Sequence, residues 1–324
     1  MDSFVFAHIP KTAGTSFRLG ADQYFGEKMV CRDYGPKAPE TSEDVKEWIY
    51  KGSNFWDFAK VFREKGYRYL AGHFPANKYA PLFGVEHMIT FMRDPVQRVI
   101  SEYNHFVRFH GYTDDFQTFY RTPKFINRQL KALHGIAWAS LGFIGITERY
   151  EDSLRLLNAK YELTIPLLAA NMNKASIIDV HTLSASDEEN IRRLNAGELA
   201  VYRQVCEHFK QRSALTELGH PFVRGMIGGV SHEAVVGWAV FDNTDEPVTI
   251  EVLIDGNLIG TAKAKDYRPH LCQIGVHRGG YVGFNMKVPR LKAGDSIECR
   301  VAETGQSLIG SPRLVTEKDV GNQT

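Results

Sequence analysis

The sequence predicts an α/β protein, with a mostly parallel sheet flanked by helices, followed by a small all-β domain resembling a sandwich or barrel. In the first two thirds of the chain, short apolar runs alternate with amphipathic helical segments. Helical periodicity then ends near residues 225–229, and alternation of apolar and polar residues replaces it. Because 324 residues exceed what one hydrophobic core usually organises, we expect two domains, at 1–224 and 225–324.

Each predicted element follows from a local pattern. Strands are expected where short apolar runs occur, at residues 4–9, 69–72, 87–91 and 143–146. Helices are expected where apolar residues recur at three- and four-residue steps, at 16–23, 95–109, 125–133, 150–157 and 186–212. The tail should contain strands at 235–241, 248–254, 257–262, 283–288 and 296–301. Between two of them, Asp255 and Gly256 predict a type I′ hairpin turn, which requires positive φ angles.

Composition narrows the classes of function. A net charge of +1 provides no global field for nucleic acid or an anionic membrane, so an anion site must be built locally. The four cysteines show no Cys-x-x-Cys pair and no histidine at zinc spacing, which disfavours a metal site or a disulfide framework. The N-terminus lacks signal-peptide features, and no apolar run reaches spanning length, so we expect a cytoplasmic protein without a membrane span.

The most informative segment lies between the first predicted strand and helix, and reads His8, Ile9, Pro10, Lys11, Thr12, Ala13, Gly14, Thr15 and Ser16. Small residues let consecutive N–H groups converge on an anion, and the helix start adds further N–H groups and the positive end of its dipole. Gly14 permits close approach, the hydroxyls are donors, and Lys11 supplies a charge. Alternatively, the hydroxyls simply cap the helix and Lys11 is solvated.

This loop is P-loop-like but is not the nucleoside triphosphate loop, because Lys11 precedes the glycine, and no magnesium arrangement is expected. It resembles the 5′-phosphosulfate loop of sulfotransferases that use 3′-phosphoadenosine 5′-phosphosulfate (PAPS). The resemblance is to the carbohydrate O-sulfotransferase branch, with its heparan sulfate 2-O-sulfotransferase-type and bacterial members, and covers about residues 1–215. It implies PAPS as co-substrate, 3′-phosphoadenosine 5′-phosphate as product, and a carbohydrate or glycoconjugate acceptor.

A second motif follows the strand predicted at 87–91. Asp94 is a good N-cap and Pro95 suits the first helical position, so Arg93 should lie at the strand's carboxyl end, where α/β sheets bind ligands. Ser101 lies about two helical turns further on. An arginine fork and a hydroxyl suit a terminal phosphate, and the resemblance assigns Arg93 and Ser101 to the 3′-phosphate of PAPS. The alternatives are an ion pair of Arg93 with Asp94 or a neighbouring carboxylate, and a helix-surface hydroxyl.

The pair Gly72–His73 ends another predicted strand and resembles the equivalent segment of carbohydrate sulfotransferases. His73 is the candidate base for an acceptor hydroxyl that attacks in line, and Lys11 would neutralise charge on the leaving oxygen, without a metal. Alternatively, His73 is a hydrogen-bonded turn residue. His8 is expected to be a strand residue pointing away from the anion, and His105 and His110 are weaker candidates for the base.

Further segments admit two interpretations each. Glu148 either orients the acceptor or His73, or is an ordinary carboxylate at a helix start. Lys174 would touch phosphate from a closing loop, or is solvated. A set of aromatic side chains lines an acceptor groove or, as their helical spacing favours, packs in the core: Phe106, Phe109, Tyr112, Phe116, Phe119 and Tyr120. Glycan binding, homodimer formation and docking of a partner are the roles open to the β-rich tail.

Two other classes of function are alternatives to a sulfotransferase. A nucleoside or sugar kinase with an atypical phosphate loop would need magnesium ligands and a lysine after the glycine, and the sequence offers neither clearly. A non-catalytic glycan-binding or scaffold protein with a residual anion pocket would bind 3′-phosphoadenosine 5′-phosphate without transferring sulfonate.

Overall fold

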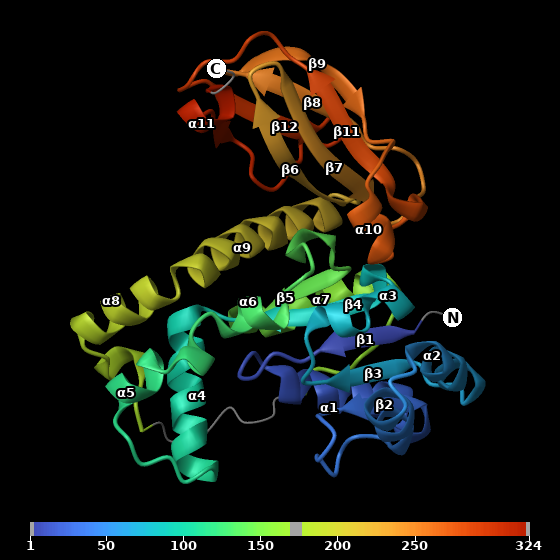
Figure 1. The fold of residues 1–324 in the computed structure, drawn as a ribbon, viewed down its shortest axis with the longest axis vertical. Coiled ribbons are helices and arrows are strands. Elements are labelled where there is room, and N and C mark those ends of the chain that lie inside the picture. The colour runs from blue at the N-terminus through green and yellow to red at the C-terminus, as the bar shows by residue number, and fades with distance from the viewer. Residues whose placement is uncertain (1–2, 169–176, 322–324) are drawn as a thin grey trace. The chain divides into compact units, whose positions relative to one another are not determined.

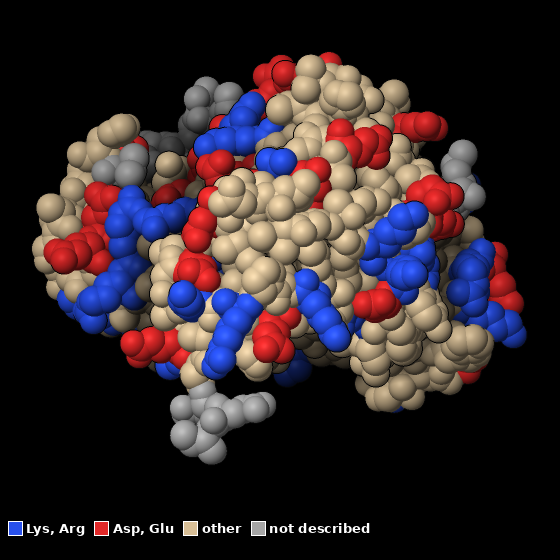
Figure 2. Space-filling view, turned by 90° about the horizontal axis from the view of Figure 1, so that it is seen from above, with Lys and Arg blue, Asp and Glu red and all other residues tan. Residues whose placement is uncertain are grey.

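The computed structural model describes residues 3–168 and 177–321. The chain divides into two compact units. The first comprises Met1–Phe83, His87–Ile136 and Phe143–Cys206, and the second comprises Gly84–Glu86, Ala137–Gly142 and Glu207–Thr324. Figure 1 traces the elements of both units. On the face seen in Figure 2, basic and acidic side chains are interspersed, as a net charge of +1 would suggest.

The first unit contains a five-stranded, all-parallel sheet in the order β2-β3-β1-β4-β5. Its strands are β1 Phe4–Ala7, β2 Val30–Asp33, β3 Tyr69–Gly72, β4 Met88–Met92 and β5 Phe143–Ile146. Their nearly continuous buried apolar runs are typical of a parallel sheet covered on both faces. The predicted α/β class is therefore confirmed. The sequence missed β2, whose last two residues are Arg32 and Asp33 and which has no long apolar run.

Helices flank this sheet, with α1 packed on β3 and α7 on β5. The longer ones are α1 Gly14–Phe25, α2 Phe55–Glu64, α4 Pro95–Phe109, α7 Tyr150–Tyr161, α8 Ala185–Leu194 and α9 Ala196–Glu217, and the shorter ones are α3 Ala80–Phe83, α5 Phe116–Arg121, α6 Arg128–Ala132 and the π-helical segment Val45–Lys51. The helix predicted at 186–212 is two helices, because the chain leaves helical geometry at Asn195. The helix predicted at 125–133 starts only at Arg128, after Asn127 with its left-handed φ of 50°.

The aromatic set of α4 and α5 mostly packs in a core. Phe116, Phe119 and Tyr120 are buried with residues of α4 such as Val99 and Tyr103, as helical spacing favoured. Phe109 is 57% exposed. Only two residues separate the end of β4 at Met92 from the start of α4 at Pro95, so the N-terminus of α4 lies at the carboxyl edge of the sheet.

The second unit contains two four-stranded antiparallel sheets, in the orders β10-β11-β7-β6 and β13-β12-β8-β9. The strands are β6 Val223–Ser231, β7 Ala234–Phe241, β8 Thr249–Ile254, β9 Asn257–Lys263, β10 Asp266–Tyr267, β11 Tyr281–Lys287, β12 Ser296–Val301 and β13 Arg313–Leu314, with short helices α10 Pro269–Gln273 and α11 Glu317–Val320. Both sheets contribute to one apolar core, so the sandwich is confirmed. Asp255 and Gly256 have φ of 49° and 78°, as the type I′ turn requires. The run 225–229 lies inside β6, at a register shift.

None of the helices in the described ranges has the length and apolar character needed to cross a membrane.

Candidate functional site

A cavity of about 830 Å³ lies in the first unit, lined by residues that follow the carboxyl ends of four neighbouring strands. Neighbouring parallel strands end at one edge, so the residues after them meet there: β1 leads into the loop, β3 into His73, β4 into Arg93 and β5 into Thr147. The cavity brings together most of the residues predicted for the donor and the base: Lys11, Ala13, Gly14, Thr15, Ser16, His73, Arg93 and Ser101.

Thr12 plays a different part in the loop. It is fully buried, and its hydroxyl donates a hydrogen bond of 2.9 Å to the carbonyl oxygen of Ile9. A hydroxyl has only one hydrogen to donate. In this structure Thr12 therefore stabilises the loop and does not donate to a ligand in the cavity.

The loop has an unusual backbone. Lys11 and Ala13 have φ of 69° and 62°, in the left-handed region that non-glycine residues rarely adopt and that is often found at functional sites. Left-handed residues alternating with right-handed ones turn successive N–H groups toward one side, forming an anion-binding concavity. Among the described residues, no side chain caps helix α1 at Ala13, so the positive end of the helix adds to this concavity.

Gly14 is required by a close contact with His8. A Cβ atom at position 14 would lie 2.0 Å from Cδ2 and 2.1 Å from Nε2 of the His8 ring. His8 also lines the cavity, so the expectation that its side chain points away from the predicted anion site is wrong. The physical reason is that His8 keeps the alternation of β1: its ring stacks on that of Phe6, which contacts Phe17 of α1, so His8 lies on the face of the sheet that α1 covers. Burial lowers the pKa of His8 well below 6.5, and His73 when protonated, Arg18 and Lys11 lower it further through their positive charges.

Arg93 connects the two predicted anion motifs. Its Nη1 donates to the carbonyl oxygen of Lys11 at 3.4 Å, and its Nη2 donates to Oε1 of Gln97 at 3.3 Å. Its Nε lies 3.8 Å from Oε1 of Glu148, so the predicted ion pair with a neighbouring carboxylate also exists. The side chain is 25% exposed and lines the cavity with Ser101.

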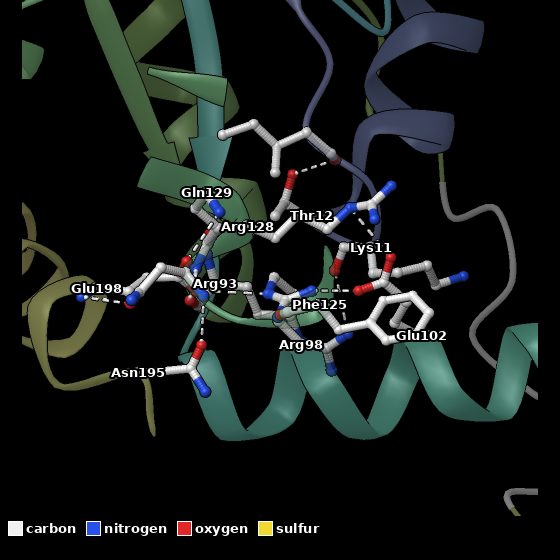
Figure 3. Close-up of polar contacts among 12 residues, drawn as sticks. Lys11, Thr12, Arg93, Arg98, Glu102, Phe125, Arg128, Gln129, Asn195 and Glu198 are labelled. Atoms are coloured by element: carbon white, nitrogen blue, oxygen red, sulfur yellow. Dashed lines mark hydrogen bonds and ion pairs between the residues drawn. The ribbon is translucent and has the colours of Figure 1, made fainter. Parts of the chain in front are cut away.

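A buried glutamine fixes the backbone of Arg93. Oε1 of Gln129 accepts from the N–H of Arg93, and Nε2 of Gln129 donates to its carbonyl oxygen, both at 2.9 Å. Glu198 on α9 in turn accepts from the backbone N–H of Gln129 at 2.8 Å and from its Nε2 at 2.7 Å (Figure 3). The sequence offered no signal for this clamp, because Gln129 lies in a short helix 36 residues beyond Arg93.

A second group of buried charged residues, centred on Arg98 and Glu102, lies next to Ser101 in the sequence of α4. Arg98 is fully buried and binds Glu102, Glu198 at 3.4 Å and the carbonyl oxygen of Phe125 at 2.8 Å. Nε of Arg128 lies 3.1 Å from Oε1 of Glu102, and Arg128 also lines the cavity (Figure 3). Sequence reasoning missed Arg128.

The geometry of His73 sets its tautomer. Its Nδ1 lies 2.7 Å from the backbone carbonyl oxygen of His8. A carbonyl oxygen can only accept, so Nδ1 carries the hydrogen and a neutral ring has its lone pair on Nε2. Desolvation by the surrounding protein lowers the pKa of His73 below 6.5, together with the charges of Arg128 and Arg18, while the bond to His8 opposes this shift. His73 thus offers a neutral proton acceptor to the cavity that it lines.

The remaining predicted residues, Glu148, His105, His110 and Lys174, differ in where the structure places them. Oε1 of Glu148 accepts from the N–H of Asp94 at 3.0 Å, and Oε2 accepts from the hydroxyl of Tyr202 at 2.8 Å, so this carboxylate fixes the start of α4. His105 and His110 line the cavity, with ring centroids 5.1 Å apart. Lys174 lies outside the described residues. Over residues 3–168 and 177–321, no group of three or more histidine, cysteine, aspartate or glutamate side chains could hold a metal ion.

No protein-family model matches the chain, and no curated protein was found to match it. Among solved structures, the chain is similar to a sulfotransferase from Alicyclobacillus acidocaldarius, with 13% sequence identity and a TM-score of 0.38 over 62% of this chain and 93% of that one.

Proposed function

We propose that this chain transfers a sulfonate group from PAPS to a hydroxyl of a carbohydrate or glycoconjugate. One observation carries the proposal: the loop from Lys11 to Ser16, the pair Arg93 and Ser101, and His73 all border one cavity. PAPS has an anionic group at each end of its adenosine, and the cavity offers cationic receptors from two motifs. Its volume of about 830 Å³ is within the range of about 300–1,000 Å³ typical of ligand sites. The carbohydrate acceptor is supported by the resemblance of the loop to the carbohydrate branch.

When bound, PAPS supplies an activated sulfonate. The N–H groups at the start of α1 would hold the sulfonate oxygens in a geometry set before the reaction. Lys11 would place its positive charge near the oxygen that leaves with the nucleotide. Arg93 and Ser101 would orient the 3′-phosphate, with Arg93 kept in place by Gln129.

His73 would act as the base on the acceptor hydroxyl. Its hydrogen bond to the carbonyl oxygen of His8 orients the ring and leaves Nε2 to take the proton. Desolvation keeps the ring neutral and ready to accept a proton near pH 7.

Replacing either cationic residue should weaken nucleotide binding. For Lys11→Ala and Arg93→Ala, we expect the affinity for 3′-phosphoadenosine 5′-phosphate to fall about 10- to 100-fold, since hydrogen bonds to charged groups contribute about 1.5–3 kcal/mol. Isothermal titration calorimetry measures this, with the exposed Lys60→Ala on α2 as the control that keeps wild-type affinity. Unchanged affinity in both cavity variants would contradict the proposed site. Tight binding without sulfonate transfer to any glycan would instead favour a non-catalytic protein.

The pH dependence of turnover should follow His73. Because its pKa is lowered, the neutral, active form persists below pH 6.5, and kcat/KM should fall only as the pH drops through a midpoint lower than 6.5. The charge of Arg18 contributes to this lowering, so Arg18→Gln should move the acid midpoint to higher pH. An acid midpoint at or above 6.5 in the wild type, or no shift in Arg18→Gln, would argue against His73 as the titrating base.

A further inference from the structure

Arg128 is a cavity-lining cation that the proposed function does not yet use. It is the first residue of α6, its side chain is 30% exposed, and its Nε is engaged by Glu102. Arg98, by contrast, is fully buried and is engaged by Glu102, Glu198 and the carbonyl of Phe125, so it cannot reach a ligand.

Neighbouring residues place Arg128 beside the Arg93 and Ser101 pair. Gln129, the next residue in the chain, clamps the backbone of Arg93 with two bonds of 2.9 Å. Glu102, the ion-pair partner of Arg128, directly follows Ser101 on α4. One residue therefore connects Arg128 to each member of the pair: Gln129 connects it to Arg93, and Glu102 connects it to Ser101. The three residues come from the end of β4, from α4 and from α6.

The charge at this end of the cavity favours a second cation for the ligand. A phosphate monoester carries about −1.5 to −2 at pH 7, whereas the charge of Arg93 is partly met by Glu148 at 3.8 Å. One shared arginine and a neutral hydroxyl would leave most of that charge uncompensated. Arg128 is also paired, with Glu102 at 3.1 Å, but Glu102 is shared with Arg98, so Arg128 still adds positive charge at this end. A guanidinium that forms an ion pair at Nε can still use its two Nη groups for bidentate binding of phosphate oxygens.

We propose that Arg128 is a second guanidinium of the 3′-phosphate receptor, and that Glu102 acts as its positioning residue. This inference rests on the proposed use of PAPS. The buried Arg98 has a role in this arrangement: it binds Oε2 of Glu102, while Nε of Arg128 lies 3.1 Å from Oε1, so Arg98 holds the carboxylate that orients Arg128.

The test compares ligands that differ by one phosphate. Affinities of 3′-phosphoadenosine 5′-phosphate, adenosine 3′-monophosphate and adenosine 5′-monophosphate are measured by calorimetry for the wild type, Arg128→Gln, Arg128→Lys and Lys11→Ala. Arg128→Gln should weaken the two ligands that carry a 3′-phosphate at least about tenfold and leave the 5′-monophosphate unchanged. Arg128→Lys should fall between, since it keeps the charge and loses the fork. Lys11→Ala should show the opposite preference, weakening the 5′-monophosphate.

The exposed Arg121→Gln on neighbouring α5 is the matched control and should change none of these affinities. Equal weakening of both monophosphates by Arg128→Gln, or no weakening of any ligand, would overturn the inference while the wild type still binds 3′-phosphoadenosine 5′-phosphate. The second of these outcomes, accompanied by a lower kcat, would assign Arg128 to the acceptor, since its charge also reaches His73. Failure of the wild type to bind any of the three ligands would instead reject the proposed function and this inference together.

Discussion

Replacing His73 with asparagine is expected to lower the rate of sulfonate transfer by about 10²- to 10⁴-fold, the usual contribution of a general base, and to leave nucleotide affinity nearly unchanged. An asparagine amide can still donate to the carbonyl oxygen of His8, as Nδ1 of His73 does at 2.7 Å. It cannot replace the basic Nε2. The variant therefore removes the proton acceptor from the cavity while the contact that orients the side chain remains available.

The measurement is single-turnover transfer from labelled PAPS, with calorimetry of 3′-phosphoadenosine 5′-phosphate alongside. His110→Asn is the matched control, because His110 lines the same cavity and is a competing candidate for the base. Full turnover in His73→Asn, together with loss of turnover in His110→Asn or His105→Asn, would assign the base to the C-terminal end of α4. Loss of nucleotide affinity in His73→Asn would show that the residue shapes the donor site instead.

Sequence reasoning succeeded where chemistry is local. Short-range patterns define the strand and the helix on either side of the loop from Lys11 to Ser16. Short-range patterns also place Arg93 before the N-cap Asp94, and His73 directly after the strand that ends at Gly72. Parallel strands bring their carboxyl ends to one edge, so locating each strand end was enough to predict that these residues would lie close together, and they line one cavity.

Sequence reasoning failed where a contact joins distant segments. Gln129 clamps Arg93 across 36 residues, and Glu198 binds Gln129 across 69. Nothing in the periodicity around either residue distinguishes a clamp from a surface polar group, because the distinction depends on burial that only the folded chain provides. Arg128 was missed for the same reason, since its partner Glu102 lies on another helix.

Gly14→Ala is expected to destabilise the protein by about 1–3 kcal/mol, as overpacking does, and to abolish measurable nucleotide binding. The new Cβ would lie 2.0 Å from the His8 ring. That ring cannot easily retreat, because it stacks on Phe6 at 5.2 Å and packs against His73 at 4.4 Å between centroids. The loop must then move, and the N–H groups that form the anion site would move with it.

Whether Gly14→Ala lowers or raises stability distinguishes a steric clash from helix propensity. Gly14 has helical geometry without positive φ, so intrinsic propensity alone would make alanine stabilising by about 1 kcal/mol. Gly197→Ala on α9 is the control: its nearest neighbour would be 3.6 Å away, an ordinary contact, and this variant should gain stability in thermal unfolding. Stability of Gly14→Ala equal to or above the wild type would refute the steric argument.

The double variant His8→Ala/Gly14→Ala separates packing from binding. Removing the ring makes room for the new methyl group, so the double variant should be more stable than the sum of the two single effects predicts. If nucleotide affinity returns together with stability, the His8 ring only packs against the loop and sets its position. If stability returns and affinity does not, the His8 ring itself contacts the nucleotide, and the anion site extends beyond the backbone of the loop to the end of β1.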